Sequence, residues 1–262
     1  SGEEFGFRGR LIWKKFISRE DCLDEYDRWS TAVRAEQLRQ PNERIQRLTN
    51  LGATIFTQGN DVVEVNGNRT NITDKDLQLV SEFTQLTDLS LEETTVSDTG
   101  IAELHNLQKL EWLNLYRSRI GDEGLQSLAR LKRLQHLPIG ETMVTDAGLV
   151  HVSDMQQLVY LGLRGNKVTD AGVKHLRGLV RLTGLHLGET QVTDKGLRHL
   201  VGLTRLEKLW LSGTSVSNQS IETLASLKSL QELYITDTKI TVEGVKRLTT
   251  RLPRCRIVAK EP

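Results

Sequence analysis

Residues 158–181 read LVYLGLRGNKVTDAGVKHLRGLVR and form one unit of a pattern that repeats every 24 residues. The units follow one another without insertion, and each approximates L-x-x-L-x-L-x-x-T-x-V-T-D-x-G-L-x-x-L-x-x-L-x-x. A fixed period of this length is typical of a solenoid, in which each unit buries its apolar face against its neighbours. The eight units begin at Val62, Leu86, Leu110, Leu134, Leu158, Leu182, Leu206 and Leu230.

Each unit predicts a strand, a turn and a short helix. Apolar residues alternate with others at the start of the unit, which favours a strand. Thr169 and Asp170 are expected to open the helix, because a hydroxyl caps free amides and a carboxylate suits the positive end of the helix dipole. Strand and helix are expected to bury Leu158, Leu161, Leu163, Val173, Leu176 and Leu179.

The ninth position of each unit carries a small polar residue. A column of hydroxyls can satisfy backbone groups where each strand turns away, so we interpret this column as structural. Its members are Thr70, Thr94, Ser118, Thr142, Asn166, Thr190, Thr214 and Thr238.

Residues 62–258 resemble leucine-rich repeat proteins. The V-T-D-x-G-L signature at 144–149 and 192–197 resembles the 24-residue subclass of many bacterial, especially planctomycete, proteins. It is also similar to the cysteine-containing repeats of F-box proteins, but the cysteine and an F-box are missing here. The resemblance implies a right-handed α/β horseshoe with an inner parallel sheet and outer short helices. It also implies protein–protein interaction on the concave face and no catalytic residue.

The sequence predicts three regions. Residues 1–61 form an N-terminal helical segment and a capping hairpin, residues 62–253 the eight repeats, and residues 254–262 a C-terminal cap strand and tail. A helical pattern over 8–40 either caps the solenoid or docks onto a separate partner. A second helical stretch at 42–51 stops at Gly52, and strands at 53–57 and 62–65 flank a turn. The apolar residues of the first pattern are Trp13, Phe16, Ile17, Leu23, Tyr26, Trp29 and Val33.

Aromatic residues recur at exposed strand positions in consecutive units. Neighbouring strands lie about 4.8 Å apart, so the rings are expected to form two strips. Four glycines beside them (Gly140, Gly162, Gly184 and Gly188) predict a shallow trough that contains Arg164. The rings either form a binding surface or only stiffen the sheet by stacking. The candidate ligand-binding residues are Trp112, Tyr116, His136, Tyr160, Arg164, His186, Trp210 and Tyr234.

Two further features of the strands carry structural predictions. Pro138 lies in the middle of an interior strand and removes one donor, which predicts a bulge or a locally opened sheet at 136–140. The eighth positions Arg69, Glu93, Arg117 and Glu141 alternate in charge, which indicates a solvated salt-bridge ladder.

Composition excludes several classes of function. The net charge is +1, from 35 basic and 34 acidic residues, so no single-sign field attracts nucleic acid. No apolar run reaches the roughly 18 residues of a membrane span, and we expect no membrane insertion. Cys22 and Cys255 lie near opposite ends, which argues against a disulfide and favours a reducing compartment such as the cytoplasm. Cys255 is interpreted as a buried cap residue. The chain begins Ser1-Gly2 without methionine, which leaves open a removed N-terminal signal or anchor.

The sequence contains no recognisable nucleophile with base and orienting acid, no metal-ligand set and no phosphate-binding loop. We therefore expect no enzyme activity, no catalytic residue, no metal and no cofactor. The favoured function is a binding module, monomeric alone, that recognises a protein or peptide on its concave face. The alternatives are a structural or assembly subunit that docks through its N-terminal helices, and carbohydrate binding on the aromatic strips.

Overall fold

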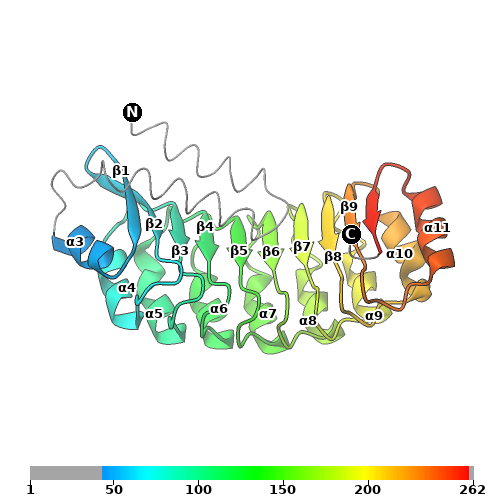
Figure 1. The fold of residues 1–262 in the computed structure, drawn as a ribbon, viewed down its shortest axis with the longest axis horizontal. Coiled ribbons are helices and arrows are strands. Elements are labelled where there is room, and N and C mark those ends of the chain that lie inside the picture. Colours follow the sequence, from blue (N-terminus) through cyan, green and yellow to red (C-terminus); the bar gives the residue numbers. More distant parts are fainter. Residues whose placement is uncertain (1–42, 260–262) are drawn as a thin grey trace.

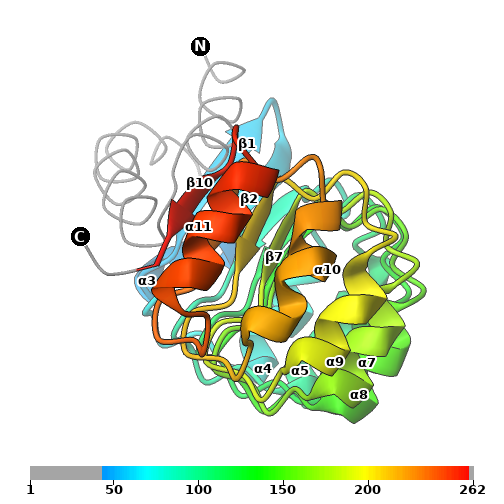
Figure 2. The ribbon, with the colours of Figure 1, turned by 90° about the vertical axis from the view of Figure 1, so that its right-hand side faces the viewer.

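Every repeat contributes one strand to a common sheet and one short helix to the opposite side (Figures 1 and 2). The computed structural model describes residues 43–259, so the helical pattern predicted over 8–40 lies outside the described residues. The sheet has ten strands in sequence order. Its strands are β1 (Thr54–Gln58), β2 (Asp61–Asn66), β3 (Asp88–Ser90), β4 (Trp112–Asn114), β5 (His136–Pro138), β6 (Tyr160–Gly162), β7 (Gly184–His186), β8 (Lys208–Trp210), β9 (Glu232–Tyr234) and β10 (Arg256–Val258).

The helices of the described part line the far side of the sheet, apart from α3 (Glu43–Asn50), which precedes β1. The repeat helices are α4 (Asp74–Val80), α5 (Asp98–Glu103), α6 (Asp122–Leu128), α7 (Asp146–Val152), α8 (Asp170–Val173), α9 (Asp194–Leu197), α10 (Ile221–Ser226) and α11 (Val242–Arg251). Four 3₁₀ turns extend or replace them: η2 (Leu104–Asn106), η3 (Lys174–Leu176), η4 (Arg198–Leu200) and η5 (Asn218–Ser220).

The apolar core runs between the sheet and the helices along the whole solenoid. In the unit that begins at Leu158, all six predicted core residues are buried. Burial of a leucine or valine side chain contributes about 1.5–3 kcal/mol, and each unit repeats this contribution. The consensus leucines therefore hold neighbouring units together, because no single unit could enclose its own apolar face.

Both ends of the described solenoid are closed by elements outside the period. At one end α3 stops where Gly52 adopts a φ of 103°, and β1 pairs antiparallel with β2. At the other end β10 pairs parallel with β9. Cys255 precedes β10 and is half-buried, and burial raises the pKa of its thiol to about 11, so the thiol stays protonated at neutral pH.

The helix-opening aspartates connect neighbouring units. Asp146 lies in the first turn of α7, as predicted, but its oxygens accept bonds from the backbone N–H (2.8 Å) and hydroxyl (2.5 Å) of Thr169 in the next unit. Thr169 in turn caps its own helix by accepting from the N–H of Ala171. The same double contact to the next unit is made by Asp74, Asp122, Asp170 and Asp194.

The glycine of the V-T-D-x-G-L signature makes room for that aspartate. A Cβ on Gly172 would lie well inside 3 Å of Asp146 Oδ1, and the same conflict recurs at Gly100, Gly124, Gly148 and Gly196. Ser220 replaces the glycine in one unit, and there its hydroxyl donates to the carboxylate of Asp194. The glycine is thus required by the close approach of two units.

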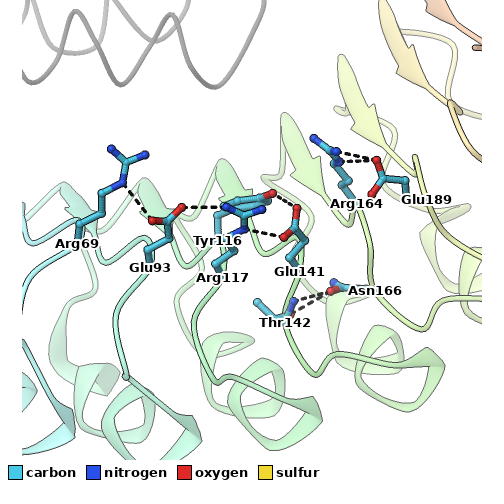
Figure 3. Close-up of polar contacts among 9 residues, drawn as sticks. All are labelled: Arg69, Glu93, Tyr116, Arg117, Glu141, Thr142, Arg164, Asn166 and Glu189. Carbon is cyan, nitrogen blue, oxygen red and sulfur yellow. Dashed lines mark hydrogen bonds and ion pairs between the residues drawn. The ribbon is translucent and has the colours of Figure 1, made fainter.

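The turn after each strand is built from two columns. The ninth-position hydroxyls donate to a backbone carbonyl three residues earlier, as Thr94 does to Leu91 at 2.7 Å. Asn166 instead accepts from the N–H of Thr142 at 2.8 Å (Figure 3). The column therefore serves the backbone, as predicted.

The eighth-position column is left-handed in all eight units. Its φ values lie between 52° and 71°, and two of its members are Gly165 and Gly213. Consecutive ion pairs join the first four members at 3.1, 3.1 and 2.6 Å, which is the predicted ladder (Figure 3). Its members are Arg69, Glu93, Arg117 and Glu141.

Pro138 reduces strand pairing without breaking the sheet. Strands β4 and β5 pair only at Trp112 and His136, whereas the neighbouring parallel pairs contain three residue pairs. Pro138 still accepts from the N–H of Leu115 at 2.9 Å. The predicted local opening of the sheet is therefore the loss of one backbone N–H donor between β4 and β5, and these two strands show no bulge.

Between residues 43 and 259, none of the helices combines the length and apolar character that a membrane span requires. Across the same residues, no group of three histidine, cysteine or acidic side chains is arranged to hold a metal ion.

Candidate ligand-binding surface

The face of the sheet that is turned away from the repeat helices is here called the sheet face. It is formed by the third, fifth and seventh positions of each unit. Parallel register aligns Trp112, His136 and Tyr160 on adjacent strands. It likewise aligns His186, Trp210 and Tyr234, here called the ring strip. The register thus brings the predicted aromatic residues together in two groups, one in each half of the sheet.

The ring strip is a continuous stack. The rings of His186 and Trp210 are 5.4 Å apart and inclined by 5°, and those of Trp210 and Tyr234 are 5.5 Å apart and inclined by 12°. Tyr160 meets Trp210 edge-on, with centroids 6.2 Å apart and planes at 81°. Offset and edge-on pairs are the favoured geometries of aromatic rings, and each stabilises by about 1 kcal/mol. The edge-on contact joins the two groups.

The predicted glycine trough is wrong, because aromatic rings occupy the space above the glycines. A Cβ on Gly184 would lie 2.8 Å from Tyr160 Cδ2, and one on Gly188 would lie 2.8 Å from His186 Cε1. At Gly140 the nearest side chain is the ring of Tyr116, at 3.1 Å. The glycines leave room for these rings, so the surface they form is a filled one.

Tyr116 is buried, not presented to solvent. Its hydroxyl donates to Glu141, and the guanidinium of Arg117 lies 5.3 Å from its ring centroid (Figure 3). Burial and the bond to Glu141 raise the pKa of Tyr116 to about 12. Burial opposes the charge of Glu141, but the bonds from Arg117 and Tyr116 outweigh it and lower the pKa of that carboxyl. Tyr116 is therefore a buried member of the sheet face, held by Glu141 and Arg117.

Charged pairs border the ring strip. Arg164 is exposed and pairs with Glu189 at 2.6 Å, rather than lying in a trough (Figure 3). Lys208 pairs with Glu232 at 2.8 Å, and Glu232 also accepts from the hydroxyl of Tyr234 at 2.6 Å. Burial and this bond raise the pKa of Tyr234 to about 12. The strip is thus an apolar band between two ion pairs.

His186 is held neutral inside this band. Burial, and secondarily the charge of Arg164, lower its pKa to about 3. Its Nδ1 accepts from the backbone N–H of Gly188 at 3.1 Å, so the ring proton of the neutral form lies on Nε2. The band therefore presents uncharged rings over the whole physiological pH range.

The neutrality of His186 can be measured. We expect its NMR titration midpoint near pH 3, and we expect Trp210→Ala to raise the midpoint toward 6.5 by exposing the imidazole. The folded pKa lies below that of the unfolded chain, so the unfolded chain binds the proton first. His186 therefore lowers stability progressively as the pH falls from about 6.5 to about 3. Titration of His186 near pH 6.5 in the unsubstituted chain would contradict this burial.

The sequence did not identify the acidic residues that orient three of the candidate side chains. Glu141, Glu189 and Glu232 orient Tyr116, Arg164 and Tyr234, respectively. Their spacing is a usable signal, because Glu141 and Glu189 each follow their partner by 25 residues, one unit plus one residue.

Comparison with known proteins identifies the repeats and the fold. A family model described as leucine-rich repeat matches residues 106–129 and 226–248. A search of curated protein sequences finds no significant match. The chain therefore contains leucine-rich repeats, as the sequence pattern predicted.

Solved structures share the solenoid at low sequence identity. An internalin C2 from Listeria monocytogenes matches with a TM-score of 0.60 and 24% identity, over 83% of this chain and 94% of that chain. The ectodomain of the Arabidopsis receptor kinase HAESA, in complex with the IDA peptide hormone, matches with a TM-score of 0.61 and 18% identity. That alignment covers 78% of this chain and 35% of the HAESA chain. These similarities establish the predicted fold class, a leucine-rich repeat solenoid.

Proposed function

We propose that the chain is a non-catalytic recognition module that binds a protein or peptide on its sheet face, centred on the ring strip. The observation that carries the proposal is the half-buried stack of His186, Trp210 and Tyr234 between two ion pairs. A central aromatic cluster with a polar rim is the arrangement of protein-binding hot spots. The remaining predicted residues, Trp112, Tyr116, His136, Tyr160 and Arg164, extend or support this surface.

The peptide bound to HAESA gives a precedent for this kind of ligand on a related solenoid. We also assign the chain to the 24-residue bacterial subclass of leucine-rich repeats, on its V-T-D-x-G-L signature. Both assignments extend beyond the shared fold, because a sequence identity of 18% does not indicate which partner this chain binds.

The stacking geometry favours a peptide over a carbohydrate. Aromatic residues that bind sugars present a ring face, whereas each face of Trp210 is turned toward a neighbouring ring. The strip offers mainly ring edges to a ligand, which suit the side chains and backbone of a peptide lying across the strands. Because His186 is neutral, the band does not require a ligand to carry a compensating charge.

Selection from a random-peptide phage library on the immobilised full chain tests the proposal. We expect selected peptides to bind about 30-fold more weakly to Trp210→Ala, because a central tryptophan contributes 2 kcal/mol or more to such interfaces. Trp210→Phe should retain part of the affinity because it keeps an aromatic ring in the stack.

Val201→Ala is the matched control, since this exposed valine follows η4 on the helix side and should leave binding unchanged. Peptides that bind wild-type protein and Trp210→Ala equally would exclude the ring strip as their site. Glycan-array binding that depends on Trp210 would replace the peptide proposal with the carbohydrate one.

A further inference from the structure

The near-neutral net charge of the chain hides a local excess of positive charge. Residues 158–205, the fifth and sixth units, contain eight basic and three acidic residues, whereas residues 62–109 contain three basic and nine acidic residues. Six of the eight basic residues lie on η3, α9, η4 or the segments that follow them, and all six are exposed. They are here called the basic patch: Lys174, Arg177, Arg181, Lys195, Arg198 and Arg205.

The repeat brings the members of the basic patch together. Lys174 and Arg198 occupy the same position of consecutive units, as do Arg181 and Arg205. Helices α8 and α9 lie side by side on the helix side of the sheet, and residues of η3 and η4 have Cα atoms within 8 Å of one another (Figures 1 and 2). Within one unit, Lys174 and Arg177 are three residues apart, a spacing that places two side chains on the same helical face. Like charges are therefore neighbours both within and between the units.

The acidic residues of the same two units do not neutralise the basic patch. Within residues 43–259, none of the six basic residues takes part in an ion pair. Asp170 and Asp194 accept hydrogen bonds from the next unit, and Glu189 pairs on the sheet face. Asp194 also attracts Arg198, but both of its oxygens already accept from Ser217. The patch therefore keeps a surplus of positive charge.

Other helix-side cations of this solenoid are compensated. Glu222 pairs with both Arg247 and Arg251 of α11, at 3.4 and 2.8 Å. In the basic patch, by contrast, the neighbouring His175 senses the uncompensated field. Burial, and secondarily the charges of Lys174 and Arg177, lower the pKa of His175. Exposed like charges held side by side favour a ligand that brings negative charge.

We propose that the basic patch binds an acidic segment of a partner protein, at a site separate from the ring strip on the opposite side of the sheet. Four of its six members are arginines, and a guanidinium can donate two parallel hydrogen bonds to one carboxylate. Faces that bind membranes add tryptophan, phenylalanine or leucine to their cations. The large apolar side chains exposed beside this patch, in the described part of the chain, are Val180 and Val201. Its composition therefore favours a protein ligand over a lipid surface.

The geometry of the patch suits an extended peptide that crosses the units. Alternate side chains of an extended chain project from the same side about 6.6 Å apart. This interval is close to the separation between neighbouring units, whose Cα atoms approach within 8 Å at η3 and η4. Gly178 and Gly202 are exposed, and a Cβ on either would meet no atom closer than 3.6 Å. The backbone between the basic side chains is thus open to a peptide with acidic residues at alternate positions.

Fluorescence anisotropy with the full chain and a rhodamine-labelled decapeptide of alternating glutamate and serine tests the proposal. We expect this peptide to bind, and a peptide of alternating glutamine and serine not to bind. The triple variant Lys174→Gln, Arg177→Gln and Arg198→Gln should weaken binding about tenfold, because each exposed charge contact contributes a factor of about two. Added salt should weaken it too, since exposed charges are screened. Failure of the unsubstituted chain to bind the acidic peptide would refute the proposal.

The matched control removes three exposed cations that follow α6 and produces the same change in net charge: Arg130→Gln, Lys132→Gln and Arg133→Gln. It should leave the affinity unchanged, and thermal unfolding verifies that both variants remain folded. Equal weakening in the two folded variants would show that the peptide responds only to net charge, which would overturn the assignment to the patch. Patch-dependent binding to phosphatidylserine vesicles, without peptide binding, would identify a lipid surface as the ligand instead.

His175 gives a second readout that needs no substitution. Carboxylates placed over Lys174 and Arg177 would offset the charges that oppose its protonation. Saturation with the acidic peptide should therefore raise the NMR titration midpoint of His175, while the resonances of His105 on η2 stay unchanged. An unchanged midpoint at saturation would place the peptide elsewhere on the chain and contradict the proposal.

Discussion

Asp146→Ala is expected to lower the free energy of unfolding by about 3 kcal/mol. The substitution removes two charge-assisted hydrogen bonds to Thr169, from its backbone N–H and from its hydroxyl. It also leaves the half-buried N–H of Thr169 without its acceptor at the junction between two units. Equilibrium unfolding in urea measures the loss. Hydrogen exchange should show that the amides of the 158–181 unit open more often.

Two comparison variants distinguish this role from a general effect of charge. Asp146→Asn should cost less than about 1 kcal/mol, since an amide oxygen can still accept from Thr169. The chain contains this arrangement, where Asn218 Oδ1 accepts from the N–H of Thr241 at 3.0 Å. Asp154→Ala removes an exposed carboxylate and should have little effect. Equal losses for Asp146→Ala and Asp146→Asn would contradict the inter-unit contact.

Much of the fold could be predicted from the period because each repeated position has one environment. Apolar positions of the unit that begins at Leu158 are buried, and the 24-residue spacing aligns Trp210 with Tyr234 on neighbouring strands. Identical spacing in every unit leaves no freedom in the register of the sheet. The repeats therefore determine which backbone positions are neighbours.

The same regularity hides which unit a side chain contacts. By sequence alone, the carboxylate of Asp146 could interact with the dipole of its own helix or with the turn of the next unit. The sequence does not distinguish them, because both environments recur every 24 residues. The exceptions distinguish the two. Asn218 precedes Thr241 as an aspartate precedes its threonine elsewhere, and Ser220 bonds to Asp194, not to its own unit.

Side-chain directions on the sheet face were also beyond the sequence. The glycines predicted an open trough, but a missing Cβ equally permits a neighbouring ring to occupy the space, as Tyr160 does at Gly184. The choice depends on burial of apolar ring area, which favours filling the space. The alternation of apolar and other residues determines on which face of a strand an aromatic side chain lies. It does not determine the rotamer of that side chain.

Gly172→Ala is expected to destabilise the chain by about 2 kcal/mol, although alanine favours helices over glycine by roughly 1 kcal/mol. The added Cβ would meet Asp146 Oδ1 and force apart two units that the Asp146–Thr169 contact holds together. Gly178→Ala is the control, since the nearest atom to its Cβ is Gln156 Nε2 at 3.9 Å. That substitution should change stability by less than about 0.5 kcal/mol.

A serine at the same position should be tolerated better than alanine, although it is larger. Ser220 occupies the equivalent position of another unit and donates its hydroxyl to Asp194, so Gly172→Ser can exchange the conflict with Asp146 for a hydrogen bond. The conflict also requires the carboxylate, and Asp146→Ala combined with Gly172→Ala should therefore cost less than the sum of the two single losses. A coupling of about 1 kcal/mol in this double-mutant cycle would assign the glycine to the inter-unit contact. Additive losses would instead show that the destabilisation by Gly172→Ala arises within its own helix. The glycine of the V-T-D-x-G-L signature would then be required by each unit separately and not by the contact between units.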